Sequence, residues 1–230
     1  MNDIDERYDT RLLAAYVRGA LRETGEPFEK PLDQLTEADC EALLALGNAA
    51  GLKTHHFKKK DALPRVNKAL GFLKAVQPQS LLDVGSGRGA FLFPFLREFP
   101  YVHVTSADIL EHRVAVLDAM HRGGLENLTA VQADITRWDA PCGGFDVVTL
   151  LEVLEHIPNV QTAVTNAVRL ARRYVVVTVP AKPDDNPEHI HLLTKPVLTE
   201  LFHNAGCVHL QFDGVPNHLF MTAKIERTSP

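Results

Sequence analysis

Three short clusters of polar residues in this sequence could do chemistry. The first is the turn DVGSGRG, residues 83–89, in which an aspartate precedes three closely spaced glycines. Glycine has no Cβ, so a turn built from it lets the backbone approach a ligand closely. The second cluster is EVLEH, residues 152–156, and the third is EHIH, residues 188–191. The carboxylates and imidazoles of these two segments could move protons or bind a divalent metal.

The turn lies between an apolar, strand-like run over residues 80–84 and a helix-like apolar pattern that ends near residue 98. A dinucleotide-binding turn usually has the spacing G-x-G-x-x-G and binds a pyrophosphate. Here the spacing is D-x-G-x-G-x-G. The carboxylate of Asp83 would repel a pyrophosphate but suits a sulfonium or an amino group. The turn therefore favours a cationic ligand.

Acidic residues also follow the next two predicted strands. From residue 80 onward, strand and helix patterns alternate, which is typical of a parallel sheet covered on both faces. Asp108 and Asp134 stand where two of these strands end, and ligands bind beyond such ends in open α/β sheets. Asp108 has the separation from the turn expected of an acid that binds ribose hydroxyls. One strand-end aspartate is often only a turn former, but three in register with the turn indicate a ligand site.

The turn and these acids resemble motif I and its neighbours in the class I S-adenosylmethionine-dependent methyltransferases, over about residues 66–226. The resemblance implies a Rossmann-like α/β fold. Its sheet would have seven mostly parallel strands, helices on both faces and a C-terminal antiparallel hairpin. It also implies S-adenosylmethionine as the cofactor. The residues that it implies in cofactor binding are Asp83, Gly85, Ser86, Gly87, Gly89, Asp108, Ile109, Asp134, Ile135 and Glu152.

The EVLEH segment leaves the catalytic chemistry open. In one helical turn, Glu152, Glu155 and His156 share a face. The segment resembles the metal site of small-RNA 2′-O-methyltransferases, which implies a divalent metal bound by these three side chains and by His189 or His191. The same string is common in methyltransferases similar to those of the ubiquinone pathway. There it implies no metal, with Glu152 near the cofactor and His156 near the substrate. Purely structural packing is the third interpretation.

Residues 1–78 are expected to form a helical cap or lid, and residues 79–230 the methyltransferase domain. Amphipathic stretches and Pro or Gly breaks predict three helices in the cap. The cap also contains the basic run HHFKKK, residues 55–60. This run could bind a phosphate, a carboxylate or an RNA backbone, or it could be an ordinary solvated surface.

The composition restricts the partners and the location. The chain has 230 residues, enough for one substantial α/β domain with a small appendage. A net charge of −5 gives no overall attraction to nucleic acid or to an anionic membrane. The N-terminus does not resemble a signal peptide, and no apolar run approaches the roughly 18 residues that span a bilayer. Three widely spaced cysteines fit a reducing compartment, so we expect a cytoplasmic protein without a membrane partner.

The sequence therefore predicts an S-adenosylmethionine-dependent methyltransferase that acts on a small molecule, at oxygen, by direct in-line displacement. His156 is the predicted base, and this version of the site has no metal. One alternative is a metal-assisted RNA 2′-O-methyltransferase that uses Glu152, Glu155 and His156. The other alternative is a non-catalytic domain that binds the cofactor.

Overall fold

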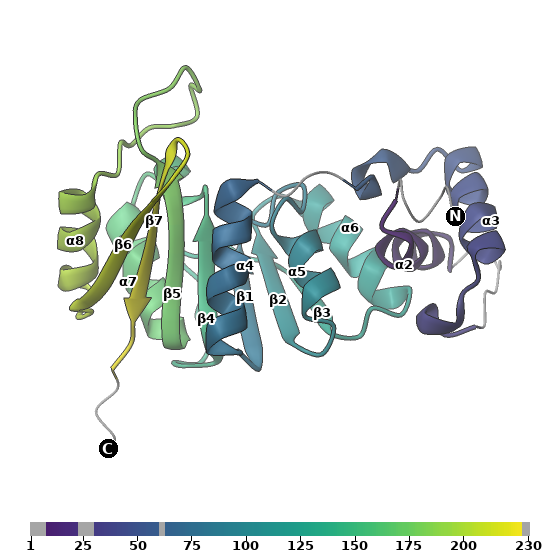
Figure 1. The fold of residues 1–230 in the computed structure, drawn as a ribbon, viewed down its shortest axis with the longest axis horizontal. Coiled ribbons are helices and arrows are strands. Elements are labelled where there is room, and N and C mark those ends of the chain that lie inside the picture. The colour runs from purple at the N-terminus through teal and green to yellow at the C-terminus, as the bar shows by residue number, and fades with distance from the viewer. Residues whose placement is uncertain (1–7, 23–29, 60–62, 227–230) are drawn as a thin grey trace. The chain divides into compact units, whose positions relative to one another are not determined.

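The computed structural model describes residues 8–22, 30–59 and 63–226, and Figure 1 shows its elements. Contacts divide the chain into two compact units. The first consists of the described part of residues 1–61 together with residues 110–131. The second consists of the described part of residues 62–109 and 132–230. All the predicted site residues belong to the second unit.

The strands form one seven-stranded sheet of order β3-β2-β1-β4-β5-β7-β6. The strands are β1 (Ser80–Val84), β2 (His103–Asp108), β3 (Leu128–Gln132), β4 (Phe145–Leu151), β5 (Ala171–Pro180), β6 (His209–Val215) and β7 (His218–Lys224). β1 pairs in parallel with β2 and β4, and β4 pairs in parallel with β5. β7 runs antiparallel to both β5 and β6. The predicted sheet with a C-terminal antiparallel hairpin is confirmed.

Helices cover both faces of this sheet in the second unit, as predicted. α4 (Pro64–Val76) and α5 (Leu92–Glu98) lie on one face, and α7 (Val160–Leu170) and α8 (Lys195–Asn204) lie on the other (Figure 1). Buried Leu82, Val148 and Val177 join α7 and α8 in one hydrophobic cluster. Strands buried on both faces have nearly continuous apolar sequences, which is why these runs predict strands well.

Among its described residues, the first unit has three α-helices: α2 (Thr10–Leu21), α3 (Glu37–Ala49) and α6 (Glu111–Arg122). Two short 3₁₀ helices, η2 (Leu32–Gln34) and η3 (Thr54–Phe57), accompany them. The backbones of α2 and α6 are in contact, because a Cβ added at Gly19 would overlap the carbonyl oxygen of Ala119. Thr36 caps α3 in a reciprocal capping box with Asp39.

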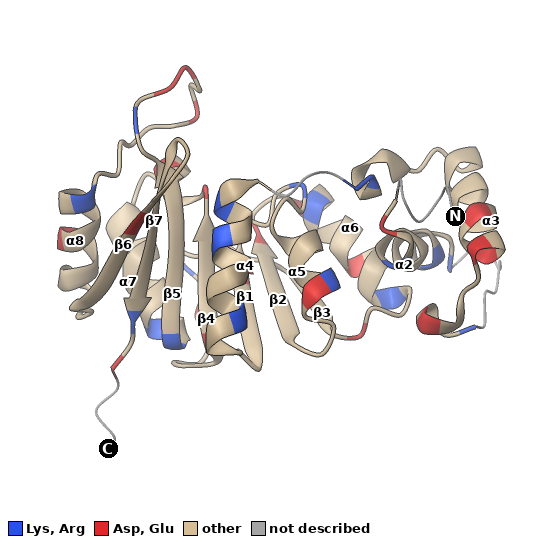
Figure 2. Ribbon diagram, viewed as in Figure 1, with Lys and Arg blue, Asp and Glu red and all other residues tan. Residues whose placement is uncertain are grey.

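The grouping of the helices differs from the expected boundary at residue 78. α4 groups with the sheet, and α6 groups with the N-terminal helices. Only residues 77–79 separate α4 from β1, so this helix is covalently close to the sheet that it packs on. Lys and Arg residues lie along α4 (Figure 2). A lid function for the N-terminal helices stays a prediction.

The basic run over residues 55–60 lies partly in η3. There Phe57 is buried, whereas Lys58 and Lys59 are exposed. Lys60 lies outside the described residues. Binding of phosphate or RNA by this run stays a prediction.

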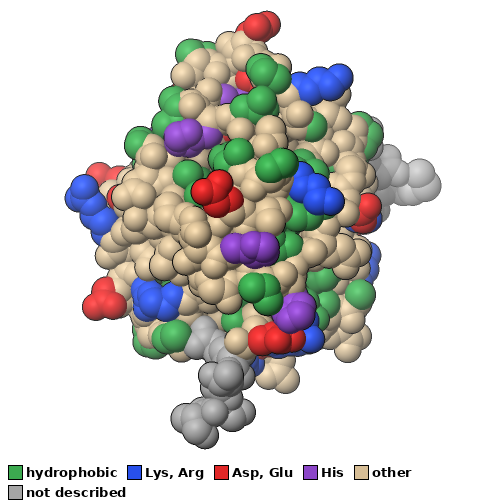
Figure 3. Space-filling view, turned by 90° about the vertical axis from the view of Figure 1, so that its left-hand side faces the viewer, with side chains coloured by type: hydrophobic (Ala, Val, Ile, Leu, Met, Phe, Trp, Pro, Cys, Tyr) green, Lys and Arg blue, Asp and Glu red, His purple; other side chains and the backbone are tan. Residues whose placement is uncertain are grey.

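The length of the helices and the side chains on one face of the surface concern possible membrane and charged partners. Within the described ranges, no helix is long and apolar enough to cross a bilayer. Figure 3 shows the face that carries α8, where hydrophobic, acidic, basic and histidine side chains are interspersed. Charge of either sign is therefore interrupted by neutral side chains on this face.

Candidate active site

The Gly-rich turn leaves β1 at the edge where the parallel strands end. Gly85, Gly87 and Gly89 have φ values of +66°, +59° and +79°, in the left-handed region that residues with a Cβ rarely adopt. A Cβ added at Gly85 would also lie 2.8 Å from Cγ2 of Val153. A Cβ added at Gly89 would lie 2.7 Å from the ring of Phe93. The turn therefore needs glycine for its backbone shape and, at Gly85 and Gly89, for space.

Asp83 is buried beneath this turn, with 2% of its surface exposed. Thr149 Oγ1 donates to one carboxylate oxygen at 2.7 Å, and Ser86 Oγ donates to the other at 2.6 Å. Burial raises the pKa of Asp83 to about 6, although the two hydrogen bonds oppose the shift. In the structure this carboxylate fixes the turn through Ser86. Its role toward a cationic ligand stays a prediction.

Asp108, at the end of β2, faces the same turn. It is 4% exposed, and the Gly87 N–H donates to its Oδ2 at 3.3 Å. The next residue, Ile109, is 64% exposed and offers apolar surface beside the acid. The structure thus brings Asp83 and Asp108 together at the glycines, as the strand-end pattern predicts.

Asp134 and Ile135, after β3, differ in exposure. Asp134 Oδ1 accepts hydrogen bonds from the backbone N–H and the hydroxyl of Thr136, both at 2.8 Å, and its side chain is 45% exposed. Ile135 is 3% exposed and belongs to the hydrophobic core. Of the two isoleucines expected to offer apolar surface to an adenine, the structure exposes Ile109 and buries Ile135.

Glu152 follows β4 and is linked to three other elements. Thr178 Oγ1, on β5, donates to Glu152 Oε1 at 2.9 Å. His218 Nε2, on β7, lies 2.8 Å from Oε2, and Arg65 Nε, on α4, lies 3.7 Å from the same oxygen. The side chain of Glu152 is thus engaged by a hydroxyl and two basic groups.

The EVLEH segment and the β5–α8 loop together form a group of potential metal ligands. One ligand atom each from Glu155, His156 and His189 lies within 4.8 Å of the others. Glu155 is fully buried, and neither of its carboxylate oxygens has a hydrogen-bond partner among the described atoms. Burial raises its pKa to about 8. Glu152 and His191, the other two alternative ligands, lie outside this group.

Hydrogen bonds orient the two imidazoles of this group. His156 Nδ1 lies 2.9 Å from the carbonyl oxygen of Glu188. A carbonyl can only accept, so Nδ1 carries a proton and the neutral ring keeps a lone pair on Nε2. His189 Nδ1 lies 2.8 Å from Asp184 Oδ2. Such contacts are typical of histidines that act as bases or bind metals.

His191 has a different role in the loop. Its Nε2 lies 3.0 Å from the carbonyl oxygen of Ile157. The backbone N–H groups of Ile190 and His191 both donate to the Glu155 carbonyl oxygen, at 3.0 and 3.3 Å. The β5–α8 loop is thereby fastened to the EVLEH segment, which keeps His189 beside His156.

Comparison with known proteins decides the family. A family model described as a methyltransferase domain matches residues 54–211, more than half of the chain. The chain belongs to the class I S-adenosylmethionine-dependent methyltransferases. No curated protein sequence matches this methyltransferase.

Solved methyltransferase structures share the fold. The 1,6-didemethyltoxoflavin-N1-methyltransferase of Burkholderia thailandensis, solved with 1,6-didemethyltoxoflavin and S-adenosylhomocysteine, is 21% identical, with a TM-score of 0.60 over 87% of this chain and 92% of that one. YcgJ of Bacillus subtilis is 14% identical, with a TM-score of 0.59 over 70% and 100%. The N-terminal domain of EvdMO1 with SAH bound is 16% identical, with a TM-score of 0.58 over 70% and 81%.

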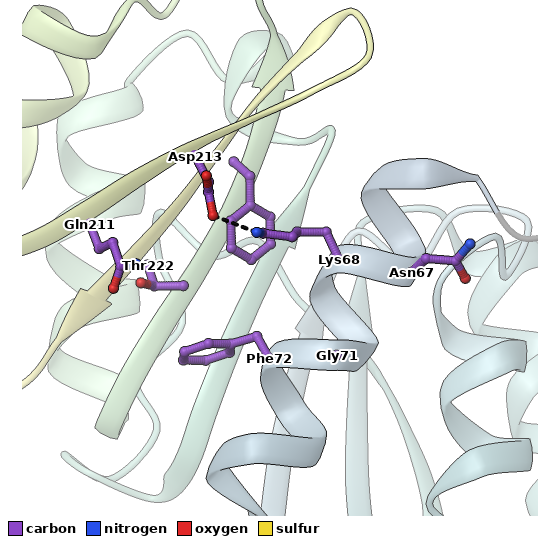
Figure 4. A pocket seen from close by; sticks show the side chains of 8 residues that line it. Asn67, Lys68, Gly71, Phe72, Gln211, Asp213 and Thr222 are labelled. Carbon is purple, nitrogen blue, oxygen red and sulfur yellow. Dashed lines mark ion pairs between the residues drawn. The ribbon is translucent and has the colours of Figure 1, made fainter.

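The methyltransferase has a separate cavity of about 330 Å³ between α4 and the β6–β7 hairpin (Figure 4). Its lining residues are Asn67, Lys68, Gly71, Phe72, Gln211, Asp213, Phe220 and Thr222. Lys68 and Asp213 form an ion pair there, and Lys68 Nζ lies 5.9 Å from the ring centroid of Phe220. None of the predicted site residues lines this cavity, so it is distinct from the Gly-rich turn.

Sequence reasoning missed three residues of the methyltransferase that contact Glu152: Arg65, Thr178 and His218. They belong to α4, β5 and β7, far apart in the sequence and outside any motif. Thr178 gave a weak signal, as a polar residue within the apolar run of β5. Arg65 stood out only as a basic residue near the run over residues 55–60, with no link to Glu152. His218 gave no signal, because single basic residues are usually surface residues.

Proposed function

We propose that this methyltransferase transfers a methyl group from S-adenosylmethionine to an oxygen atom of a small molecule. The observation that carries this proposal is the orientation of His156, whose Nδ1–H donates to the Glu188 carbonyl and whose Nε2 remains a proton acceptor. A hydroxyl nucleophile gains from such a base during attack. His156 is therefore the proposed catalytic residue.

The residues at the Gly-rich turn fit the cofactor. When bound, S-adenosylmethionine supplies a methyl group that is already activated on a sulfonium. Gly85 and Gly87 are only partly buried, Ile109 offers exposed apolar surface, and Asp134 keeps an exposed carboxylate. The proposed cofactor-binding residues are Asp83, Gly85, Ser86, Gly87, Gly89, Asp108, Ile109, Asp134 and Glu152. Ile135 is not included because it is buried in the core.

Three observations support a small-molecule acceptor. The net charge of −5 gives no general attraction for RNA. Ile190 and Leu192, next to His189 and His191, are 52% and 44% exposed and provide apolar surface for a small organic molecule. The Burkholderia relative was solved with a small heteroaromatic compound, and its name places the methyl on nitrogen. Nitrogen acceptors therefore belong in any test of the proposal.

A transfer assay with methyl-labelled S-adenosylmethionine tests the proposal. The acceptor panel contains phenols, aliphatic alcohols, heteroaromatic amines and short RNAs. We expect label in hydroxyl compounds, together with release of S-adenosylhomocysteine. Transfer only to the amines would overturn the oxygen assignment, and transfer only to RNA would overturn the small-molecule assignment.

Arg65 is proposed to bind the carboxylate of the cofactor's methionine part. Its Nε faces Glu152 Oε2 at 3.7 Å, which is too long for a hydrogen bond. The two Nη atoms of a guanidinium form a planar fork that matches a carboxylate. We expect Arg65→Met to weaken S-adenosylhomocysteine binding about tenfold. Binding of 5′-methylthioadenosine, which lacks the carboxylate, should not change.

Lys68→Met is the matched control for Arg65→Met, because Lys68 is also a basic residue of α4 that pairs with a carboxylate, that of Asp213. It should leave both affinities unchanged. Calorimetry with the two ligands measures the difference. Equal losses for both ligands in Arg65→Met would rule out recognition of the carboxylate by this side chain.

A metal-assisted transfer is the second candidate, and the group formed by Glu155, His156 and His189 favours it. One carboxylate and two imidazoles suit Mn²⁺ or Zn²⁺. A metal bound there would lower the pKa of a coordinated hydroxyl, so His156 would act as a ligand and not as the base. In the same transfer assay, activity lost with EDTA and restored by Mn²⁺ would support this version. Activity that is indifferent to EDTA would support the metal-free one.

We place the enzyme in the cytoplasm. Cys40, Cys142 and Cys207 are not joined in disulfides, and Cys142 is exposed. Free thiols are usual in reducing compartments, and disulfides are usual in oxidising ones. Fluorescence of a tagged chain in intact and fractionated cells would test the location.

A further inference from the structure

Glu152 has an unusual backbone conformation. Its φ is +61°, and among the described non-glycine residues only Gln77 and Asn217 share a positive φ. Gln77 ends α4, and Asn217 lies in the two-residue turn between β6 and β7, both common places for this conformation. Glu152 instead follows a buried strand. Left-handed conformations of residues with a Cβ persist where the surroundings hold them, and they cluster at functional sites.

Contacts with two neighbouring strands hold Glu152 in this conformation. The Glu152 N–H donates to the carbonyl oxygen of Thr178 at 3.0 Å, and the Thr178 hydroxyl donates back to Glu152 Oε1 at 2.9 Å. The other oxygen, Oε2, lies 2.8 Å from His218 Nε2. Arg65 reaches the same oxygen only at 3.7 Å, so His218 is the closer basic partner.

His218 is itself fixed at both ends of its ring. While Nε2 contacts Glu152, Nδ1 lies 2.9 Å from the carbonyl oxygen of Pro216 in the hairpin turn. A carbonyl and a carboxylate both only accept, so the ring makes both hydrogen bonds by donating from both nitrogens, as an imidazolium. His218 lies opposite Pro180 in the β5–β7 ladder. Its side chain is 18% exposed and that of Glu152 is 21% exposed, so the pair is largely shielded from water. A shielded, well-aligned pair resists the screening that weakens surface ion pairs.

The conformation of Glu152 affects the Gly-rich turn through the next residue. Val153 follows Glu152 in the chain and packs on Gly85, where an added Cβ would lie 2.8 Å from Val153 Cγ2, and the φ of Glu152 is +61°. If Glu152 returned to an ordinary φ, Val153 would lose its present position on the first glycine of the turn. A shift of this kind changes the surface proposed to bind the cofactor.

We infer that His218 is a positioning residue for the cofactor site: through Glu152 it keeps Val153 seated on Gly85 and so maintains the Gly-rich turn. This inference rests on the proposed function for its effect on S-adenosylmethionine. The link between His218 and Glu152 does not depend on that function. It gives the C-terminal hairpin a part in methyl transfer beyond completing the sheet.

A mutant cycle tests the link without any ligand. His218→Leu removes the donor, and Glu152→Gly removes both the carboxylate and the backbone strain, because glycine adopts a positive φ readily. We expect His218→Leu to lower Tm by roughly 3–6 °C in the natural chain. In the Glu152→Gly background it should have almost no effect. Equal decreases in both backgrounds would overturn the inference.

Calorimetry with S-adenosylhomocysteine tests the effect on the cofactor site. His218→Leu should weaken binding about tenfold, and His218→Gln, which keeps a donor, should recover most of the affinity. His209→Leu is the matched control, because His209 also pairs with a glutamate, Glu226, but at an exposed site. An unchanged affinity in His218→Leu would overturn the inference. If the natural chain bound no S-adenosylhomocysteine, the proposed function would fail, and the Tm cycle would still decide whether His218 positions Glu152.

Discussion

Replacement of His156 by alanine is expected to lower kcat for methyl transfer to a hydroxyl acceptor by roughly 10²–10⁴-fold, the usual contribution of a general base. The neutral ring donates through Nδ1 to the Glu188 carbonyl and offers Nε2 as the acceptor for the hydroxyl proton. Alanine removes that acceptor and leaves the Gly-rich turn unchanged. Affinity for S-adenosylhomocysteine should therefore stay the same while kcat falls.

His203→Ala is the control for His156→Ala, because His203 is an exposed histidine on α8. It should leave kcat unchanged. Initial rates at saturating acceptor, together with calorimetry of the cofactor product, measure the two effects. A kcat for His156→Ala within about twofold of the natural enzyme would show that the base lies elsewhere or that the reaction needs none.

Glu155→Gln should stabilise the protein by a few kcal/mol at pH 9 in the presence of EDTA. The folded state raises the pKa of Glu155 from 4.5 to about 8, mainly through burial, so it retains a proton that the unfolded chain has lost. The wild-type free energy of unfolding therefore falls as pH rises from about 4.5 to 8. Glutamine has no such titration, and its variant should lose this part of the pH dependence.

Urea unfolding of the two proteins at pH 5 and pH 9 measures this difference. Other groups with shifted pKa values, such as Asp83, titrate in both proteins and cancel in the comparison. Parallel pH profiles would mean that Glu155 does not titrate as its burial implies.

Added Mn²⁺ should stabilise the natural protein at pH 7 and leave Glu155→Gln unaffected if Glu155, His156 and His189 bind a metal.

Most of the fold could be predicted from local sequence patterns. The strand ends at Asp108 and Leu151, the Pro64 start of α4 and the Thr36 cap of α3 all follow from apolar runs and terminal signals. The start of β5 was harder to predict. The β-branched run predicts a strand over residues 174–179, whereas β5 begins at Ala171 and includes Arg172 and Arg173. Arg172 Nε donates to the buried Asp146 at 2.8 Å, a long-range contact that no local pattern reveals.

The candidate site could be predicted only where a motif carried it. The Gly-rich turn and Asp108 meet as the strand ends predict, because parallel strands bring their C-terminal ends to one edge. The sequence does not separate the two isoleucines, because the same apolar residue suits a ligand surface and a core, and Ile135 lies in the core. The separation of Glu152 from Glu155 was not foreseeable either. A helical turn would align them, but the positive φ of Glu152 and the short η4 (Leu154–His156) break that geometry.

The most direct test of the account is a calorimetric titration of the purified chain with S-adenosylhomocysteine. The chain should bind one equivalent saturably. Gly87→Arg should abolish binding, because Gly87 has a φ of +59° and its N–H donates to Asp108. Gly214→Arg is the control, because a Cβ added at Gly214 would meet no atom within 4 Å. This variant should bind S-adenosylhomocysteine like the natural chain. No binding by the natural chain, or unchanged binding by Gly87→Arg, would contradict a cofactor site at this turn.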